Sequence, residues 1–367
     1  MLAQLRNVIS TDFSSLLASK RLLVGLDIGS SSIKVVQLKE SKGRYVLQKY
    51  GVKALEPEVI VDGTVMDEGR VVAAIKELLE EQGIKQKAVA ISISGHAVIV
   101  KKISLPPMPD EELEGQVKLA AEQYIPFDIN EVNLDFHVLQ PGEGGEDGDG
   151  QMFVLLVAAK KDKINELTEL VKTAGLTPAV LDVDAFAIQN MHDINYPGHK
   201  HEVVTVVNIG ASVMNVNIIR DGASLFTRDI PLGGNKYTEA VQRELGLSFE
   251  EAEEVKKNPG ARRDAEDVVR MVLDTVNAEV ASEIARTVDY YKSTSGEGDV
   301  ERLLLCGGGS KVQGLRDQLQ ERMQISVSMA NPFATIACEG CSSDVSLDEY
   351  GPMAAVGVGL ALRAQGD

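Results

Sequence analysis

The chain has 367 residues, which is enough for two or three domains, and its 44% hydrophobic content is that of an ordinary globular protein. Its formal net charge of −18 argues against a nucleic-acid-binding protein, which would carry a basic face, and no apolar run reaches the roughly 18–20 residues that span a membrane. The three cysteines fit a reducing compartment, and the isolated Cys338–Cys341 pair lacks the second pair that a structural zinc site needs.

The chain begins with an amphipathic pattern over residues 1–20, which predicts an extension that packs on its own domain or contacts a partner or another copy. From residue 21 the pattern predicts a first α/β lobe over 21–86. Its expected strands are 22–27, 33–39 and 45–52, followed by a helix over 67–82. We expect residues 177–201 and 342–367 to complete this lobe, with 192–201 as a polar linker to a second lobe.

Residues 87–176 differ from this lobe and predict a small α+β module inserted into it. A helix is expected to begin with Asp110 as its N-cap, because acidic residues follow in the first turn, and to end before Pro126. The expected strands are 88–94, 97–103, 133–140 and 152–160, with a helix over 162–174. The glycine-rich acidic segment 142–150 separates the last two strands and predicts a solvated loop.

Residues 202–341 predict a second α/β lobe. Its expected strands are 203–207, 214–220, 223–230 and 302–306, and its expected helices are 235–245, 248–257, 264–292 and 311–323. A last helix is expected over 352–363. The longest helix carries apolar residues along one side, which predicts a face buried against the lobe. That face contains Val268, Val272, Val276, Val280, Ile284 and Val288.

A short pattern occurs twice in the chain, 181 residues apart. The segments Val24–Val36 and Val206–Val216 each read as an apolar strand, a tight turn of small residues and a second apolar strand, which predicts a β-hairpin. Exposed N–H groups at the tip of such a hairpin form a concavity that binds anions. A glycine-rich turn, Gly307–Ser310, follows a further apolar strand. A single such hairpin is as often only a turn, but the ordered combination predicts a two-lobed nucleotide-binding protein.

The ordered set of hairpin, inserted module, hairpin, glycine-rich turn and C-terminal helix resembles the actin-like ATPase superfamily, whose lobes have a ribonuclease H-like fold. Further segments narrow the resemblance to the PilM family of type IV pilus assembly and, more distantly, to FtsA. These segments are Ile93–Gly95, Glu122–Phe127, Asp182–Ala187, Arg228–Gly234, Ala252–Lys256 and Gly359–Arg363. The resemblance covers about residues 21–364 and implies an α/β, two-lobed actin-like fold that binds ATP or ADP with Mg²⁺ between the lobes.

The resemblance also implies roles for individual residues. Asp27 would hold Mg²⁺ through water, and Lys34 would contact a phosphate. The phosphate donors on the first hairpin would be Gly29, Ser30, Ser31 and Ser32, faced by Asn208, Gly210, Ala211 and Ser212 on the second, with Gly233 and Gly234 beside them. Glu253 and Lys256 would contact adenosine, although an exposed ion pair is the simpler interpretation. Gly307, Gly308, Gly309 and Ser310 would lie against the sugar and the α-phosphate.

The second hairpin departs from the family pattern, which usually has aspartate where this chain has Asn208. A neutral amide is a poorer partner for a metal ion than a carboxylate. We therefore expect hydrolysis to be slow or absent, and we assign no catalytic residue. Asp182 and Asp184 are expected to be structural, which argues against a sugar or acetate kinase on the same fold, because such an enzyme needs a base in its cleft.

The resemblance implies a cytoplasmic adaptor, recruited to the inner face of the cytoplasmic membrane, that binds the N-terminal tail of a PilN-type membrane protein. In the family this tail lies between the first lobe and the inserted module. Val98, Ile99 and Val100 are candidates for the groove, with ordinary strand core as the alternative. Other pilus assembly partners and self-association stay open. The competing hypothesis is an FtsA-like polymer, although the last residues show no basic amphipathic helix of the kind that FtsA carries.

Overall fold

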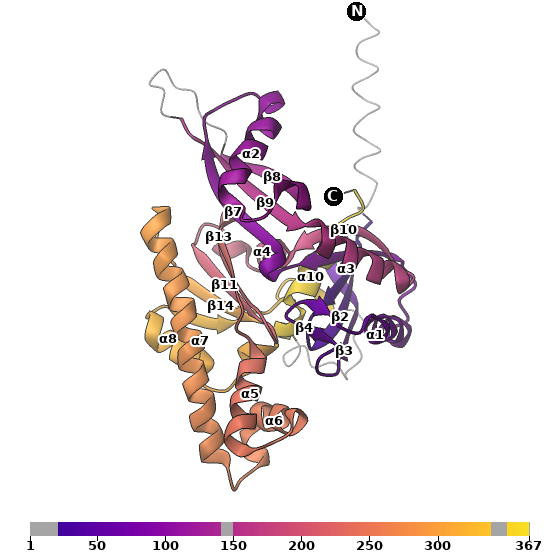
Figure 1. Cartoon of the computed structure of the whole chain (residues 1–367), viewed down its shortest axis with the longest axis vertical. Helices are drawn as coiled ribbons and strands as arrows, with labels where there is room; N and C mark the ends of the chain where they lie inside the picture. Colours follow the sequence, from indigo (N-terminus) through magenta and orange to yellow (C-terminus); the bar gives the residue numbers. More distant parts are fainter. Residues whose placement is uncertain (1–20, 141–149, 339–350, 367) are drawn as a thin grey trace, which may run out of the picture.

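The computed structural model describes residues 21–140, 150–338 and 351–366. The expected N-terminal extension, most of the acidic segment 142–150 and Cys341 lie outside the described residues. Two α/β lobes, each built on its own sheet, lie side by side, and a smaller module stands at one end of the molecule (Figure 1). No helix of the described ranges combines the length and apolarity needed to cross a membrane.

The first lobe is built on a six-stranded sheet with the order β10-β6-β1-β2-β3-β16. Its strands are β1 (Val24–Ile28), β2 (Ser32–Ser41), β3 (Arg44–Ala54), β6 (Ala88–Ile93), β10 (Thr177–Val183) and β16 (Ala337–Cys338). A small two-stranded sheet, β4 (Ile60–Val61) and β5 (Thr64–Val65), precedes helix α1 (Glu68–Glu81). Helix α1 begins as expected, with the Asp67 carboxylate accepting a hydrogen bond from the N–H of Arg70.

The second lobe repeats this topology with the strand order β13-β12-β11-β14-β15. Its strands are β11 (Val204–Ile209), β12 (Met214–Arg220), β13 (Ala223–Ile230), β14 (Arg302–Cys306) and β15 (Ser326–Met329). In both sheets three antiparallel strands are followed by two parallel ones on the other side of the first strand. The pattern that occurs twice in the sequence therefore marks the start of two equivalent sheets, and the prediction of a two-lobed actin-like α/β fold is confirmed.

Two helices, α4 (Asp184–Asn195) and α10 (Ala355–Ala361), lie between the two sheets and join the lobes in one hydrophobic core. That core takes side chains from both lobes, among them Ile188, Val206 and Leu304. Helix α10 packs so closely that a Cβ on Gly359 would lie 1.7 Å from the carbonyl oxygen of Ala187. Because real atoms do not approach to that distance, only glycine fits there. The connection between the lobes is therefore a packed core and not a free linker.

The module contains the three-stranded sheet β7-β9-β8 and helix α2, which lies against it. These elements are β7 (Val98–Leu105), β8 (Val132–Gln140), β9 (Met152–Lys160) and α2 (Asp110–Tyr124). Strand β6 pairs with β1 and β10 in the first sheet, and helix α3 (Lys161–Thr173) packs on α1. The range 87–176 expected for the module thus includes two elements whose partners lie in the first lobe.

Helix α2 corrects one sequence prediction. Asp110 is the first residue of the helix and Pro109 is its N-cap, with an extended ψ of 150°. Proline fixes φ near −65° and has no N–H to satisfy, so it suits the residue that leads into a helix. The end of the helix is as expected, because Tyr124 is its last residue and Pro126 follows two positions later.

The predicted linker over 192–201 is corrected as well, because α4 continues to Asn195. His192 is only 2% exposed and stacks on the ring of Tyr196, with 5.5 Å between the ring centroids. The side-chain oxygen of Asn195 accepts a hydrogen bond from the N–H of Thr335. His192 and Asn195 are therefore buried inside the fold, which composition alone does not distinguish from a solvated linker.

The second lobe carries helices α5 (Gly234–Leu245), α6 (Phe249–Lys257), α7 (Glu266–Ser295) and α8 (Leu315–Met323). The apolar face expected for α7 is buried in its second half, from Val276 to Val288, but not in its first half. There Val269 and Leu273 occupy the core, whereas Val268 and Val272 are only partly buried. A strict four-residue repeat rotates around a helix with 3.6 residues per turn, so one straight side cannot stay buried over its whole length.

Candidate functional site

The first hairpin, formed by β1 and β2, places a charged pair at its tip. Asp27 and Lys34 lie opposite each other in the register, and Lys34 Nζ is 3.1 Å from Asp27 Oδ2. The turn is closed by the Gly29 N–H, which donates to the Ser32 carbonyl at 3.1 Å. A Cβ on Gly29 would lie 3.5 Å from Lys34 Nζ and 4.0 Å from Asp27 Oδ1. The charged heads therefore lie directly over the backbone of the turn.

The three serines of this turn differ in exposure. Ser30 is partly buried, Ser31 is exposed and Ser32 is buried. The carbonyl of Ser31 accepts a hydrogen bond from the N–H of Leu55, which fixes the turn against the end of β3. The hydroxyl groups of Ser30 and Ser31 are thus the accessible donors at this tip.

The second hairpin, formed by β11 and β12, is fixed by its neighbours. The Gly210 N–H donates to the Val213 carbonyl at 2.9 Å, and the first N–H groups of α5 donate back to the turn. Those bonds join Gly234 to Gly210 and Asn235 to Ala211, each at 2.8 Å, and the Asn235 amide reaches the Ser212 hydroxyl at 3.4 Å. A Cβ on Gly233 would lie 2.5 Å from the Ala211 carbonyl oxygen. The second turn and the start of α5 are therefore one unit.

The third glycine cluster lies against the end of β11. Gly307 has a φ of +82°, and a Cβ there would lie 2.4 Å from the Ile209 carbonyl oxygen, while one on Gly309 would lie 2.5 Å from Ile209 Cγ2. Gly308 is different, because the nearest atom to its Cβ position is a methyl group of Met353 at 3.9 Å. The Ser310 hydroxyl is buried and donates to the Gly307 carbonyl. Packing therefore explains Gly307 and Gly309, and leaves Gly308 open to a ligand.

Glu253 and Lys256 on α6 form a partly buried pair and not the exposed one of the simpler interpretation. Lys256 Nζ also donates to the Gly234 carbonyl at 3.2 Å and to the Thr238 hydroxyl at 3.0 Å. Burial lowers the pKa of the Lys256 ammonium. Burial alone would raise the pKa of the Glu253 carboxyl, but the charge of Lys256 and the hydrogen bonds from Lys256 and Thr238 together outweigh it, and the pKa is lowered. The pair is thus connected, through Gly234, to the turn of the second hairpin.

Asn208 does not face a cation but starts a chain of side-chain hydrogen bonds. Its amide donates to Asn215 Oδ1 at 3.0 Å, and the Asn215 amide donates to Asp229 Oδ1 at 2.7 Å. The other carboxylate oxygen of Asp229 accepts a hydrogen bond from the N–H of Gly95, where the module begins. Burial raises the pKa of Asp229, and the bonds from Asn215 and Gly95 offset part of that rise.

Asp184, which the sequence analysis took as structural, is a further candidate for the site. It is the first residue of α4, only partly accessible, and its carboxyl lies near the charges of Asp27 and Asp229. Burial and the charge of Asp27 raise its pKa to about 6, although hydrogen bonds with Ser92 and Ser94 work against that rise. Asp182 is structural as expected, since Arg363 Nε donates to it at 2.6 Å. The available signal in the sequence was its position, because Asp184 begins a helix directly after the two buried residues that end strand β10.

The donor set fits a magnesium nucleotide better than a metal held by the protein alone. Among the described residues no group of three or more His, Cys, Asp or Glu side chains could hold a metal ion. Mg²⁺ is commonly bound by one or two carboxylates together with substrate phosphates and water. Asp27 and Asp184 offer such carboxylates, and Lys34 with the N–H groups of the first turn offers donors for phosphate.

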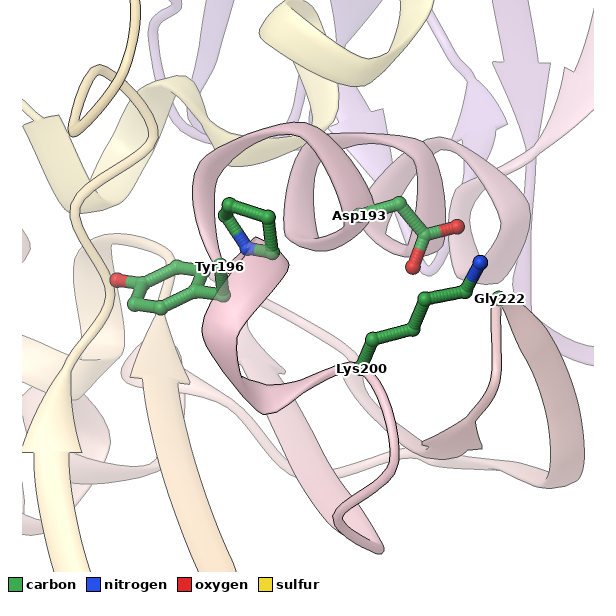
Figure 2. A pocket seen from close by; sticks show the side chains of 5 residues that line it. Asp193, Tyr196, Lys200 and Gly222 are labelled. Atoms are coloured by element: carbon green, nitrogen blue, oxygen red, sulfur yellow. The ribbon is translucent and has the colours of Figure 1, made fainter.

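A separate hollow of about 290 Å³ lies near the connection between the lobes (Figure 2). It is lined by Asp193, Tyr196, Pro197, Lys200 and Gly222, and the Lys200 ammonium points toward the Asp193 carboxylate. None of the residues predicted from the sequence to bind nucleotide lines it. Because its two charged groups face and offset each other, its chemistry favours neither an anion nor a cation.

The residues proposed for the peptide groove lie at the junction of the module and the first lobe. Val98 is 8% exposed and belongs to a cluster with Val183 and Ala185 of the first lobe. Val100 is partly buried against the same cluster, whereas Ile99 packs on the core beneath α2. Val98 and Ile99 thus also serve as strand core, which leaves Val100 as the partly buried residue of the three that packs at the junction.

Comparison with known proteins identifies the family of this chain and supports its fold. The family model of the type IV pilus assembly protein PilM matches residues 25–365. A chain in a solved PilM–PilN type IV pilus biogenesis complex is 32% identical, with a TM-score of 0.83, over 94% of this chain and 99% of that one.

More distant relatives share the fold. The cell division protein FtsA of Streptococcus pneumoniae is 25% identical over 354 residues, which covers 86% of this chain and 77% of FtsA. MreB5 of Spiroplasma citri, solved with ADP, is 12% identical with a TM-score of 0.52, over 92% of this chain and 94% of that one, and so shows the fold alone. With a family match across nearly the whole sequence, the chain belongs to the type IV pilus assembly protein PilM family.

Proposed function

We propose that this protein is a nucleotide-binding adaptor of type IV pilus assembly, which holds ATP or ADP with Mg²⁺ between its lobes and binds the N-terminal tail of a PilN-type membrane protein. The observation that carries the proposal is the Asp27–Lys34 pair at a hairpin tip, with Asp184 close by and a second, packed hairpin in the equivalent place. The relative in the PilM–PilN complex supports the choice of partner.

Different residues contact different parts of the nucleotide in this proposal. Lys34 and the accessible donors of the first turn hold the phosphates, while Asp27 and Asp184 hold the hydrated metal ion. Bound Mg²⁺ supplies positive charge that neutralises the phosphate oxygens. The second turn, with Gly233 and Gly234, lies on the other side, and Gly308 leaves room for the sugar. Glu253 and Lys256 then meet the nucleoside beside the start of α5.

Hydrolysis is proposed to be slow or absent. The amide of Asn208 already donates to Asn215, and a neutral amide does not orient metal-bound water as a carboxylate does. A phosphate-release assay with Mg²⁺–ATP should therefore show less than one turnover per minute. Rapid Mg²⁺-dependent release would contradict this part of the proposal.

Nucleotide binding is tested by calorimetric titration of ATP and ADP with and without Mg²⁺. We expect Lys34→Ala to weaken binding at least tenfold, because it removes the only cation at the tip of the first hairpin within the described residues. The matched control is Lys53→Ala. Lys53 lies on β3 of the same sheet, and its removal breaks only surface ion pairs with Glu77 and Glu81 of α1. Equal affinities for the two variants would refute the site.

Partner binding is tested by titrating a synthetic PilN-type N-terminal tail into the nucleotide-loaded protein. Saturable one-to-one binding is expected. Val100→Glu should abolish it by placing a charge at the junction, while Met271→Glu, on the exposed surface of α7, should not. Binding to such a tail would recruit the protein to the inner face of the cytoplasmic membrane. No binding, together with nucleotide-dependent sedimentation, would favour the FtsA-like polymer that the curated relatives suggest.

A further inference from the structure

We propose that Asp229 couples the nucleotide site to the inserted module, so that the affinity for the tail peptide depends on the bound nucleotide. This inference rests on the proposed function and adds its regulation. Asp229 lies on β13 of the second lobe, and its two carboxylate oxygens accept hydrogen bonds from two different directions. One donor is Asn215, on strand β12 of the second hairpin, and the other is the backbone of Gly95, where the module begins.

The first half of the connection leads to the nucleotide. Asn208 is opposite Asn215 in the β11–β12 register, two residues before the turn at Gly210. Asn215 is 3% exposed and bonds to both Asn208 and Asp229. Because all three side chains are joined by hydrogen bonds, a nucleotide that moves the second hairpin relative to the first moves Asp229 as well.

The second half leads to the proposed groove. Gly95 has a φ of +74° and begins the short turn Gly95–Ala97, which joins β6 of the first lobe to β7 of the module. Directly after this turn, Val98 and Val100 pack on the first lobe at the junction. The N–H that donates to Asp229 thus lies in the turn that leads into β7, and β7 contributes Val98 and Val100 to the junction.

A carboxylate suits position 229 because it can accept two hydrogen bonds. Two N–H donors meet the side chain of Asp229 from two sides, and a carboxylate accepts both, whereas an asparagine of the same shape accepts only one. Asp229→Asn therefore breaks one of the two bonds while keeping the volume of the side chain. It tests the connection without leaving a cavity.

The structure also offers a matched control. Lys102 of β7 pairs with Glu297, which follows α7 in the second lobe, and Arg220 donates to the carbonyl of Glu297. This contact joins the same strand of the module to the same lobe, but it has no bond to Asn208, Asn215 or Asp229. Lys102→Ala consequently removes a module–lobe contact and leaves the proposed connection in place.

The experiment compares full-length wild type, Asp229→Asn, Asn215→Leu and Lys102→Ala. The tail-peptide Kd is measured by calorimetry without nucleotide, with ADP–Mg²⁺ and with ATP–Mg²⁺. In the wild type and in Lys102→Ala we expect Kd values that differ at least fivefold between nucleotide states. In Asp229→Asn and Asn215→Leu we expect the peptide Kd to differ by less than twofold between nucleotide states, with nucleotide affinities close to wild type. The inference would be overturned if Asp229→Asn kept the wild-type difference in Kd between nucleotide states. It would also be overturned if the wild type itself had the same Kd in every nucleotide state.

Amide hydrogen exchange separates this inference from the proposed function. Adding ATP–Mg²⁺ should change protection over residues 95–105 in the wild type but not in Asp229→Asn, and this readout needs no peptide. If the wild type binds nucleotide and shows no change there, the coupling is refuted while nucleotide binding stands. If the wild type binds no nucleotide at all, the proposed function itself fails, and the coupling fails with it.

Discussion

The two hairpins occupy equivalent places in two equivalent sheets, yet they carry different chemistry. Asp27 faces Lys34 in the first, and Asn208 faces Asn215 in the second, with the same spacing of seven residues. The first pair is charged, bonded within itself and partly accessible. The second is neutral, and its bonds continue to Asp229 and the module. The same hairpin backbone thus carries a charged pair in the first lobe, and in the second lobe it carries a neutral pair that is hydrogen-bonded to Asp229.

The turns of the two hairpins also differ in how closely they are packed. The first turn is held by a backbone hydrogen bond from Leu55, which directly follows β3, and the charged heads of Asp27 and Lys34 lie over Gly29. The second is packed against the start of α5 and against Gly307 and Gly309. A turn that is packed on two sides moves only together with its neighbours. The comparison therefore predicts that substitutions in the first hairpin act on ligand binding, and substitutions around the second act on the fold and on the coupling.

The largest effect is expected for Gly307→Ala, which disturbs the packing of the second hairpin. A Cβ would lie 2.4 Å from the Ile209 carbonyl oxygen, and the φ of +82° with ψ of 164° is strained for any other residue. Strain and overpacking together should lower the free energy of unfolding by about 4 kcal/mol, measured by urea titration. Gly308→Ala is the control and should keep wild-type stability while weakening nucleotide binding. Equal stability of both variants would refute the distinction.

The next effect concerns the charged pair of the first hairpin. Lys34→Ala leaves the Asp27 carboxylate, which is 15% exposed, without its partner, so the free energy of unfolding should fall by about 3 kcal/mol. Adding Asp27→Asn should restore most of the loss, because no unpaired charge remains. The urea midpoints of the two single variants and the double variant measure this coupling. Strict additivity would mean that the pair makes no direct contribution.

Asp184, whose carboxyl lies near Asp27 of the first hairpin and near Asp229, should make stability depend on pH. Its pKa in the folded protein is about 6, above the ordinary value of 3.8. The folded state then binds the proton more tightly, so stability is highest below about pH 4 and is lost as pH rises through 6. Asp184→Asn removes this loss and should stabilise the protein by about 2 kcal/mol at pH 7.5, and by much less at pH 4. An equal gain at both pH values would exclude Asp184 as the cause.

The smallest effect is expected for Asn208→Asp, which makes the second hairpin resemble the first. The new carboxylate cannot donate to Asn215 Oδ1, and it adds negative charge near Asp229. Without nucleotide the free energy of unfolding should fall by about 1 kcal/mol at pH 7.5. Mg²⁺–ATP should recover the loss, because the ion gains a ligand. A variant that is more stable than wild type without Mg²⁺ would contradict this reasoning.

The sequence predicted much of this architecture from local patterns. The two apolar strand–turn–strand segments, their order and the third glycine cluster indicated a duplicated two-lobed fold, and the strands and helices lie close to the expected ranges. Errors arose where a residue's environment is set by distant segments. The polar residues His192 and Asn195 indicated a linker, but both are buried inside the fold. The first half of α7 was misassigned because a four-residue repeat does not follow the 3.6-residue turn.

The candidate site divides in the same way. Asp27, Lys34 and the turn glycines could be named from the sequence, because a hairpin brings residues seven apart face to face and local spacing is enough to pair them. Asp184 and the bonds of Asp229 with Asn215 and Gly95 could not, since Asp229 and Gly95 are 134 positions apart. Sequence by itself thus determined which local units form. Tertiary structure alone decided which carboxylates are buried together, because burial and charge depend on segments that meet only in the folded chain.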